Sequence, residues 1–233
     1  MLEESLTNGL DTLGLAWDAE TPQRFRRYYT LLQETNAVMN LTAISGEEET
    51  VRLHFLDSAS PLLLFSMEGA AVIDVGTGAG FPGFPLKLLR PDISLTLLDS
   101  QRKRVDFLNR VSEDLGLSNV RCVHRRAEDC GDDREHFDFA VSRAVARLNI
   151  LCELCLPYVR LGGFFLALKG PAALEEVREA EQAIKQLGGR LEQVFNYTVP
   201  GAALHHNIVV VRKKAPTLKK YPRPFGQIKK NPL

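Results

Sequence analysis

An acid and three alternating glycines follow a short apolar run in the first half of the chain. Residues 71–75 read Ala-Val-Ile-Asp-Val, and Gly76, Gly78 and Gly80 come next, before Phe81. The β-branched run predicts a buried strand, and the glycines predict a tight loop that leads into a helix. Loops of this kind hold nucleotide-like ligands in α/β proteins.

Two cofactor classes compete for this loop. The dinucleotide fingerprint has its third glycine at the position of Phe81, so a phosphate-binding interpretation weakens. The carboxylate of Asp74, just before the glycines, would repel a pyrophosphate but attract the ammonium and sulfonium groups of S-adenosylmethionine. Glycines would let the backbone approach the methionine part closely, since they carry no Cβ. A plain turn in an α/β fold is the third interpretation.

A second acid ends the next apolar run. Residues 93–99 read Ile-Ser-Leu-Thr-Leu-Leu-Asp, and Asp99 follows Gly76 by 23 positions. An acid at this place hydrogen-bonds ribose hydroxyls in α/β folds. Adenosine is common to both cofactors, so Asp99 alone does not separate them. Together with Asp74 it favours S-adenosylmethionine.

The pattern of helices and strands divides the chain into three parts. Residues 1–66 are predicted to form an N-terminal helical extension, whose place relative to the ligand site stays open. Residues 67–214 alternate strands and helices, which predicts a mostly parallel seven-stranded sheet covered on both faces. Its last strands, 191–199 and 207–212, lack an intervening helix and should pair as an antiparallel hairpin. Residues 215–233 form a basic C-terminal tail.

The sequence predicts the bounds of two helices in the second half of the chain. The pattern predicts one helix from Arg147 to Arg160. It predicts another that opens at Pro171 and stops at Gly188-Gly189. The core face of this second helix is expected to comprise Leu174, Val177, Ile184 and Leu187.

Composition and cysteine usage limit the class of protein. The chain has 233 residues, of which 45% are hydrophobic and 25% charged, and it lacks an apolar run of eighteen. We therefore expect a cytoplasmic protein that does not contact a membrane. A monomer is also expected, although the sequence does not show the oligomeric state. The four cysteines are irregularly spaced, which fits a reducing compartment. Cys152 and Cys155 resemble a metal or redox pair, but their apolar surroundings favour core packing, and no metal is expected.

Charge is unevenly distributed along the chain. Residues 1–70 hold eleven acids and four arginines, whereas residues 71–233 hold eighteen acids and 25 Lys or Arg, so a net charge of −7 faces one of +7. The basic excess peaks from Arg212 onward, interleaved with Tyr221 and Phe225. Such a tail suits a nucleic-acid backbone with bases to stack on, although a solvated tail is the simpler alternative.

Seven motifs occur together in a characteristic order. They are Asn40-Leu-Thr-Ala-Ile44, His54-x-Leu-Asp-Ser58, Asp74-Val-Gly-Thr-Gly-Ala-Gly-Phe-Pro-Gly-Phe-Pro-Leu86, Asp99-Ser-x-x-Lys-Arg-x-x-Phe-Leu108, Arg126-Ala-Glu128, Ser142-Arg-Ala144 and Tyr221-Pro-Arg223. From about residue 20 to the C-terminus the chain thereby resembles the RsmG, or glucose-inhibited division protein B, family of bacterial ribosomal RNA methyltransferases. The Gly-Phe-Pro-Gly loop and the Ser-Arg-Ala motif are far more specific than the glycines alone.

The resemblance implies a class I, Rossmann-like S-adenosylmethionine-dependent methyltransferase fold. It also implies methylation of guanine N7 at position 527, in the 530 loop of 16S ribosomal RNA, in free RNA or in the small ribosomal subunit. Gly76 and Phe81 would line the methionine end, Asp99 the ribose, and Arg143 the entrance for the base. The expected cofactor-binding residues are Asp74, Gly76, Gly78, Gly80, Phe81, Asp99, Ser100, Ala127, Glu128 and Arg143, with Ala127 and Glu128 at the adenine.

RNA contacts are expected from basic residues near the strand ends and in the tail. The set comprises Arg126, Arg143, Lys169, Arg212 and Arg223. The chain departs from the resembled family at His205-His206-Asn207, where an arginine is common, so a phosphate contact there is weaker or is made by Arg212. His54 either touches RNA or braces the loop before the first strand, and Asp57 and Asn40 either touch RNA or cap helices.

The implied chemistry needs little from protein side chains. Guanine N7 presents an in-plane lone pair, so alignment with the sulfonium methyl group supplies most of the acceleration and no base is required. No catalytic residue is therefore assigned. Two alternatives stay open: a cofactor-sensing RNA-binding protein without catalysis, and a nicotinamide-dependent oxidoreductase, which Asp74 and the missing third glycine disfavour.

Overall fold

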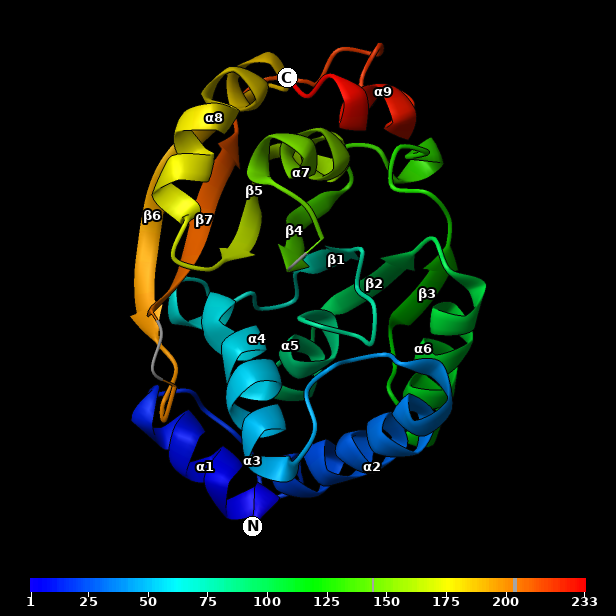
Figure 1. Ribbon diagram of the computed structural model, residues 1–233, viewed down its shortest axis with the longest axis vertical. Helices are drawn as coiled ribbons and strands as arrows, with labels where there is room; N and C mark the ends of the chain where they lie inside the picture. The colour runs from blue at the N-terminus through cyan, green and yellow to red at the C-terminus, as the bar shows by residue number, and fades with distance from the viewer. Residues whose placement is uncertain (144, 203–204) are drawn as a thin grey trace.

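The computed structural model describes residues 1–143, 145–202 and 205–233. Within these ranges seven strands form a single sheet with helices on both faces (Figure 1). The strands are β1 (Ala71–Val75), β2 (Ser94–Asp99), β3 (Val120–His124), β4 (Phe137–Arg143), β5 (Val159–Lys169), β6 (Gly189–Thr198) and β7 (His205–Lys213). The helices are α1 (Leu2–Thr12), α2 (Thr21–Met39), α3 (Glu47–Thr50), α4 (Asp57–Ala59), α5 (Gly83–Leu89), α6 (Arg102–Asp114), α7 (Leu148–Cys155), α8 (Ala173–Gln186) and α9 (Phe225–Lys230).

The sheet has the strand order β3-β2-β1-β4-β5-β7-β6. Strands β1 to β5 are parallel, and β7 runs antiparallel between β5 and β6. The predicted class I methyltransferase architecture, including its C-terminal hairpin, is confirmed. The carboxyl ends of β1, β2, β3 and β4 therefore meet at one edge of the sheet, where open α/β sheets bind ligands.

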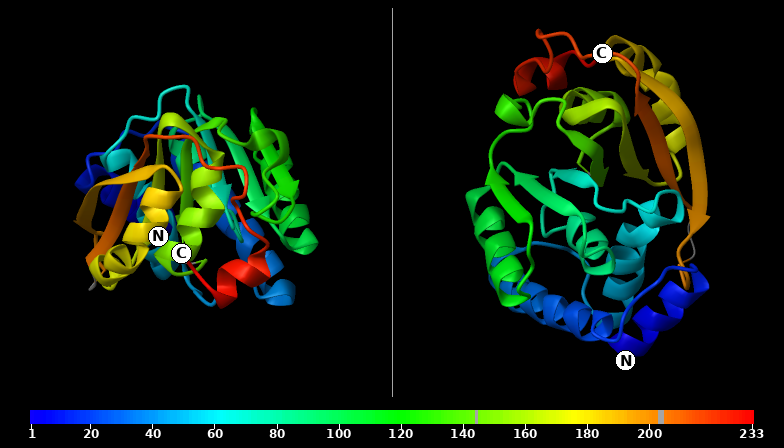
Figure 2. Two further views of the ribbon diagram at one scale, coloured as in Figure 1. Left: turned by 90° about the horizontal axis from the view of Figure 1, so that it is seen from above. Right: turned by 180° about the vertical axis from the view of Figure 1, so that it is seen from behind.

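Alternate side chains along the strands pack into two separate cores. In β1, Val72 points into the core formed with the N-terminal helices, α5 and α6, and Ile73 points into the core formed with α7, α8 and Ile228. This period of two is the pattern of strands buried on both faces. Figure 2 shows the molecule from above and from behind, with α2 along one end and the C-terminal segment crossing the other.

The N-terminal helical extension packs against the glycine loop. The stretch from α3 through α4 is helical throughout, with a π-helical part at Val51–Leu56 between them. Tyr28 of α2 lies with its ring centroid 5.6 Å from that of Phe55 and 5.3 Å from that of Phe84. Its hydroxyl donates to the carbonyl oxygen of Ala79 in the loop at 2.6 Å. The extension, whose place the sequence leaves open, thus borders the ligand-binding edge.

Two predictions for the elements after β4 are wrong in detail. The helix that begins near Arg147 ends at Cys155 rather than Arg160, because a 3₁₀ turn at Leu156–Tyr158 leads directly into β5. On α8, Val177, Ile184 and Leu187 face the core as expected, but the side chain of Leu174 is 62% exposed. The core position in the first turn is taken by Ala173 instead.

The C-terminal segment, residues 215–233, folds back onto the protein and does not extend into solvent as a free tail. Tyr221 and Ile228 are buried in the core beside α7 and α8. Both interpretations of the basic tail leave out this packing. Its lysines Lys219, Lys220, Lys229 and Lys230 remain exposed.

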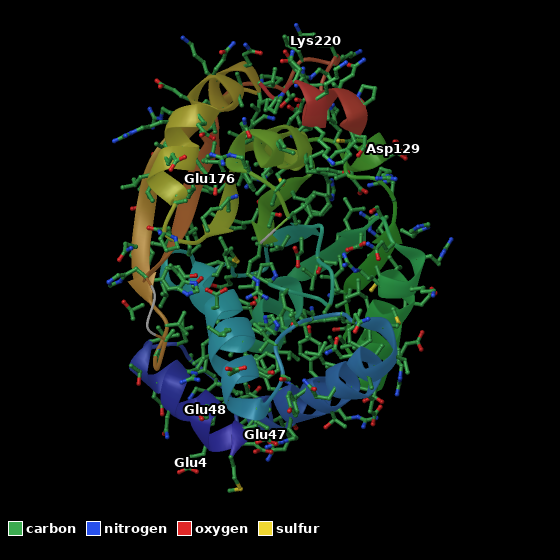
Figure 3. The ribbon with its side chains drawn as sticks, viewed as in Figure 1. Glu4, Glu47, Glu48, Asp129, Glu176 and Lys220 are labelled. Carbon is green, nitrogen blue, oxygen red and sulfur yellow. The ribbon has the colours of Figure 1, made fainter. Side chains whose placement is uncertain are left out.

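Figure 3 labels acidic groups at both ends of the long axis. Glu4, Glu47 and Glu48 lie at the end formed by α1 and α3. Lys220 lies at the opposite end, in the C-terminal segment, and Asp129 also lies toward that end. The exposed lysines of the C-terminal segment would attract an RNA backbone.

Truncation of two α8 side chains tests the face that the structure assigns to this helix. Ile184→Ala should lower the free energy of unfolding by about 2 to 5 kcal/mol, because it leaves a cavity in the core. Leu174→Ala, the matched control at an exposed site, should change it by less than about 0.5 kcal/mol. Urea denaturation measures both values, and equal losses would contradict the assigned face.

Candidate functional site

The loop between β1 and α5 takes a shape that glycine alone allows. Gly76, Gly78 and Gly80 have positive φ angles of 74°, 61° and 102°. A Cβ on Gly76 would lie 2.6 Å from Cγ2 of Val145, and one on Gly80 would lie 2.2 Å from Cδ2 of Phe84. A Cβ on Gly78 would meet nothing within 4 Å. The loop backbone is therefore tightly held on one side and borders open space on the other.

Asp74 supports this loop from below. Its side chain is fully buried, and Oδ2 accepts hydrogen bonds from Oγ1 of Thr77 at 2.6 Å and from the backbone N of Gly83 at 2.8 Å. Burial raises the pKa of Asp74 to about 7, although these two hydrogen bonds oppose the shift. The carboxylate thus lies beneath the loop, whereas the sequence argument places it against a cationic ligand.

Asp99 lies at the end of β2 and borders a cleft of about 400 Å³. Its Oδ2 accepts from the backbone N of Gly78 at 3.0 Å, and its Oδ1 accepts from the backbone N of Gln101 at 2.8 Å. Nη1 of Arg104 lies 3.4 Å from Oδ2. A carboxylate has about four acceptor positions, so Asp99 can still receive hydroxyl donors from a ligand in the cleft.

The turn after β3 forms the opposite wall of the cleft. Arg125, Arg126, Ala127 and Glu128 all line it. The carbonyl oxygen of Ala127 accepts from the hydroxyl of Tyr158 at 3.0 Å, which holds this turn against the sheet. Arg125 forms an ion pair with Asp133, whereas the side chain of Arg126 is exposed at the rim.

Arg143, at the end of β4, is the centre of a buried polar network. Its Nη1 donates to Oδ2 of Asp57 and to the carbonyl oxygen of Leu53, both at 2.8 Å. Its Nη2 lies 2.9 Å from Nδ1 of His54. The guanidinium also lies over the ring of Phe81, 5.0 Å from its centroid. Ala144, the last residue of the Ser-Arg-Ala motif, lies outside the described residues.

His54 is neutral and has both ring nitrogens engaged. Burial, and then the positive charge of Arg143, lower the pKa of His54 to about 3. Nδ1 therefore accepts from Arg143, and Nε2–H donates to Oγ1 of Thr42 at 2.7 Å. The imidazole stacks on Phe81 with the ring centroids 4.3 Å apart. His54 thus supports Phe81, after the first strand, whereas the sequence-based alternative to RNA contact was bracing of the loop before that strand.

Asp57 connects this network to the C-terminal hairpin. Its Oδ1 accepts from the hydroxyl of Tyr197 at 2.7 Å and from Nδ1 of His206 at 2.8 Å. Burial tends to raise the pKa of Asp57, but hydrogen bonds from His206, Tyr197 and Arg143 outweigh it and hold the pKa at about 2. His206, at the position that departs from the family pattern, thus acts within the protein as a partner of Asp57.

The cleft brings together most of the residues expected to bind the cofactor. Those that line it are Gly76, Gly78, Phe81, Asp99, Ser100, Ala127, Glu128 and Arg143, and Arg126, which was expected to bind RNA, lines it as well. Asp74 lies below the loop. Gly80 faces Phe84 and Tyr28. These last two residues support the shape of the site from outside the cleft.

Three residues expected to bind RNA have other partners. Nζ of Lys169 donates to Oε2 of Glu176 and to the carbonyl oxygen of Ala146. In the register of β5 and β7, Arg212 lies opposite Phe164, and Asn207 lies opposite Lys169 at the ligand-binding edge. Arg212 is thus five residues, about 17 Å along the strand, from that edge. It therefore cannot replace a phosphate contact near His206.

The third of these residues is Arg223. It forms hydrogen bonds with the buried carboxylate of Glu153, with Nη2 2.6 Å from Oε2. Its guanidinium thus has a structural partner. Of the five expected RNA contacts, Arg126 is the exposed cation at the rim of the cleft.

Several residues of the cleft were not predicted from the sequence. Leu41, Thr42, Arg104, Leu154 and Phe225 also line it. Thr42 belongs to the motif that begins at Asn40, and Arg104 to the motif that begins at Asp99, so their motifs were a usable signal. Nothing in the sequence pattern connects Leu154 or Phe225 with the glycine loop.

Side chains that bind metals do not gather in the described part of the chain. Among these residues, no group of three or more His, Cys, Asp or Glu side chains could hold a metal ion. Cys152 and Cys155 are buried free thiols, and burial raises the pKa of Cys152 and that of Cys155. In the same residues, no helix has both the length and the apolar character needed to cross a membrane.

The strand order, the glycine loop after β1 and the acid that ends β2 define a class I methyltransferase fold. Solved structures share it: TrmN from Thermus thermophilus has a TM-score of 0.53 at 19% identity and covers 68% of this chain and 48% of its own. A SAM-dependent methyltransferase from Aquifex aeolicus has a TM-score of 0.52 at 21% identity and covers 70% of this chain and 92% of its own.

The sequence comparisons identify the family. The model of the GidB family, described as rRNA small subunit methyltransferase G, matches residues 21–204. A relative from Clostridium botulinum (strain Loch Maree / Type A3), named ribosomal RNA small subunit methyltransferase G, is 45% identical over 98% of this chain and 97% of its own. One of the same name from Clostridium beijerinckii is 47% identical over the same shares. The chain belongs to this family and is a methyltransferase.

The contact between His206 and Asp57 predicts a pH-dependent stability. The hydrogen bond to Asp57 raises the pKa of His206 above 6.5, so this contact stabilises the fold fully below pH 6.5 and is lost as pH rises through the native pKa. The free energy of unfolding of wild type relative to His206→Gln should therefore fall by about 1 kcal/mol as pH rises from about 6 to about 8.5. Urea titrations at several pH values measure it.

His205→Gln is the matched control for this measurement. His205 is the exposed neighbour, and its ring contacts Oγ1 of Thr198. The difference between wild type and this variant should not change with pH. Contributions from Asp74 and Lys213, whose pKa values lie at about 7 and about 8, cancel in both differences. A pH-independent difference for His206→Gln would contradict the ion pair.

Proposed function

We propose that the chain transfers the methyl group of S-adenosylmethionine to N7 of a guanine in the 530 loop of 16S ribosomal RNA, the guanine at position 527. The observation that carries the proposal is the convergence of the glycine loop, Asp99 and Arg143 on one cleft at the carboxyl edge of the sheet. The family and the printed names of the relatives support a small-subunit ribosomal RNA as substrate.

The cleft residues fit S-adenosylmethionine in shape and in hydrogen-bonding capacity. Gly76 and Gly78 would bring the backbone close to the methionine part, since Gly78 borders open space where a Cβ would stand. Asp99 would accept hydroxyl hydrogens of the ribose with the acceptor positions left free by Gly78 and Gln101. Ala127 and Glu128 would contact the adenine.

The cofactor supplies an electrophilic methyl group on a positively charged sulfur. In the transfer, the N7 lone pair forms a bond to the methyl carbon, the carbon–sulfur bond breaks with its electron pair left on sulfur, and the guanine acquires the positive charge. No proton leaves N7, so the residues of the cleft need only align the two reactants and exclude water.

The state of the buried network agrees with an acceptor that loses no proton. His54 uses both nitrogens, in contacts with Arg143 and Thr42. Asp57 uses both oxygens, in contacts with Arg143, Tyr197 and His206. His54 therefore has no free nitrogen from which to remove a proton, as methylation of an exocyclic amine would require. Asp57, whose pKa is held at about 2, is a weak base.

The proposed substrate surface surrounds the rim of the cleft. Arg126 is exposed there, and the lysines of the C-terminal segment are also exposed. Lys220 lies at the end of the molecule opposite Glu4 and Glu47 (Figure 3). We infer that these cations contact phosphates, so that binding weakens as salt increases. The enzyme would act in the cytoplasm, where ribosomal subunits assemble.

The proposed function is tested by methyl transfer from radiolabelled S-adenosylmethionine. The substrates are 16S ribosomal RNA and small subunits that lack 7-methylguanosine, followed by nucleoside analysis. Label in 7-methylguanosine at position 527 is the expected result. Label in another nucleoside would contradict the proposed atom, and absence of label on both substrates would contradict the activity on this RNA.

Substitution of Asp99 tests the assigned ribose contact. Asp99→Ala removes hydrogen bonds to a charged group, worth about 1.5 to 3 kcal/mol, so the Kd for S-adenosylhomocysteine should rise about 10- to 100-fold. Asp106→Ala, at an exposed site on α6, is the matched control and should bind like wild type. Calorimetric titration measures both, and unchanged affinity in Asp99→Ala would refute the contact.

A further inference from the structure

The C-terminal segment reaches the cleft through one aromatic side chain. Phe225, the first residue of α9, lines the cleft together with Ala127, Glu128 and Leu154. In Figures 1 and 2, α9 lies beside the loop that follows β3. Ala127 and Glu128 belong to that loop and mark the proposed adenine end. Phe225 thus lines the same cleft as the residues proposed to contact the adenine.

A buried ion pair fixes the chain just before Phe225. Glu153 of α7 is fully buried, and its Oε1 accepts from the backbone N and from Nε of Arg223, both at 2.8 Å. Nη2 of Arg223 donates to Oε2 at 2.6 Å. Helix α7 therefore anchors the segment through Glu153, and its next residue, Leu154, lines the cleft together with Phe225.

Further contacts hold the segment on both sides of Phe225. Nη1 of Arg134 donates to the carbonyl oxygen of Tyr221 at 2.8 Å, and the hydroxyl of Tyr221 donates to Oε1 of Gln186 at 3.0 Å. After Phe225, the side chain of Ile228 is fully buried in the core beside α7 and α8. The backbone that carries Phe225 is therefore held on both sides, and its partly buried side chain packs against the core beside α7 and α8.

We propose that Phe225 is a cofactor-binding residue whose ring forms an apolar wall against the adenine base of S-adenosylmethionine. This inference rests on the proposed function, because it assumes that the cofactor occupies the cleft with its adenine near Ala127. A purine has flat faces on which an aromatic ring packs, so Phe225 can supply a large apolar contact area at this end of the cleft.

Phe225→Ala tests the wall directly. Base–aromatic contacts of this kind are lost on truncation, and the Kd for S-adenosylhomocysteine should rise about tenfold. The Kd for adenosine, measured by competition, should rise by the same factor, because both ligands carry the base. Phe225→Tyr keeps the ring and should bind both ligands like wild type.

Leu218→Ala is the matched control in the same segment. Leu218 is 58% exposed, and its truncation should leave both Kd values unchanged. Thermal unfolding of each variant checks that the fold is intact, which we expect because Phe225 is only partly buried.

The outcomes separate the wall from the function on which it rests. Wild type that binds S-adenosylhomocysteine, together with an unchanged Kd in Phe225→Ala, overturns the wall alone. A loss for S-adenosylhomocysteine without a loss for adenosine also overturns it, because the contact would then not be to the base. Wild type that binds neither ligand overturns both the wall and the proposed cofactor site.

Discussion

The site depends on one buried ion pair, between Arg143 at the end of β4 and Asp57 of the N-terminal extension. Their side chains approach to 2.8 Å, and both are nearly excluded from solvent. A buried charge is tolerated only when it is paired and its remaining hydrogen-bonding positions are filled. His54 fills a position on Arg143, and Tyr197 and His206 fill positions on Asp57. The extension, the parallel sheet and the C-terminal hairpin are thereby fixed relative to one another.

This arrangement makes the N-terminal extension a part of the cleft. The guanidinium of Arg143 and the imidazole of His54 both contact the ring of Phe81, which follows the glycine loop. Tyr28 holds the same loop through the carbonyl of Ala79, and Asp74 holds it from below. The loop that would cradle the cofactor is therefore shaped by residues from both parts of the chain. Loss of the extension would affect the cleft as well as stability.

Local pattern in the sequence predicts the sheet, the loop and the acid of β2, because each depends on neighbouring residues. Glycines at alternate positions need positive φ angles, and strands buried on both faces have a continuous apolar pattern. The roles of Asp74 and Lys169 depend instead on which groups the fold brings near them. Thr77 donates a hydrogen bond to Asp74, and Glu176 forms an ion pair with Lys169. The side chains of Asp74 and Lys169 are both buried outside the cleft. Leu174 was misassigned because Ala173 takes its core position.

Arg223 shows why a run of basic residues is ambiguous. In the sequence it belongs to a basic segment without acids, for which RNA binding and solvation are the two local interpretations. Its partner, Glu153, lies 70 positions earlier and is the one charged residue of α7. A fully buried carboxylate is stabilised by a cationic partner, so the isolated Glu153 was the informative residue. The pair of Arg223 and Glu153 fixes the C-terminal segment, so the exposed lysines of this segment have a defined place relative to Arg126. RNA phosphates bound to these lysines would therefore be held at a defined distance from the cleft.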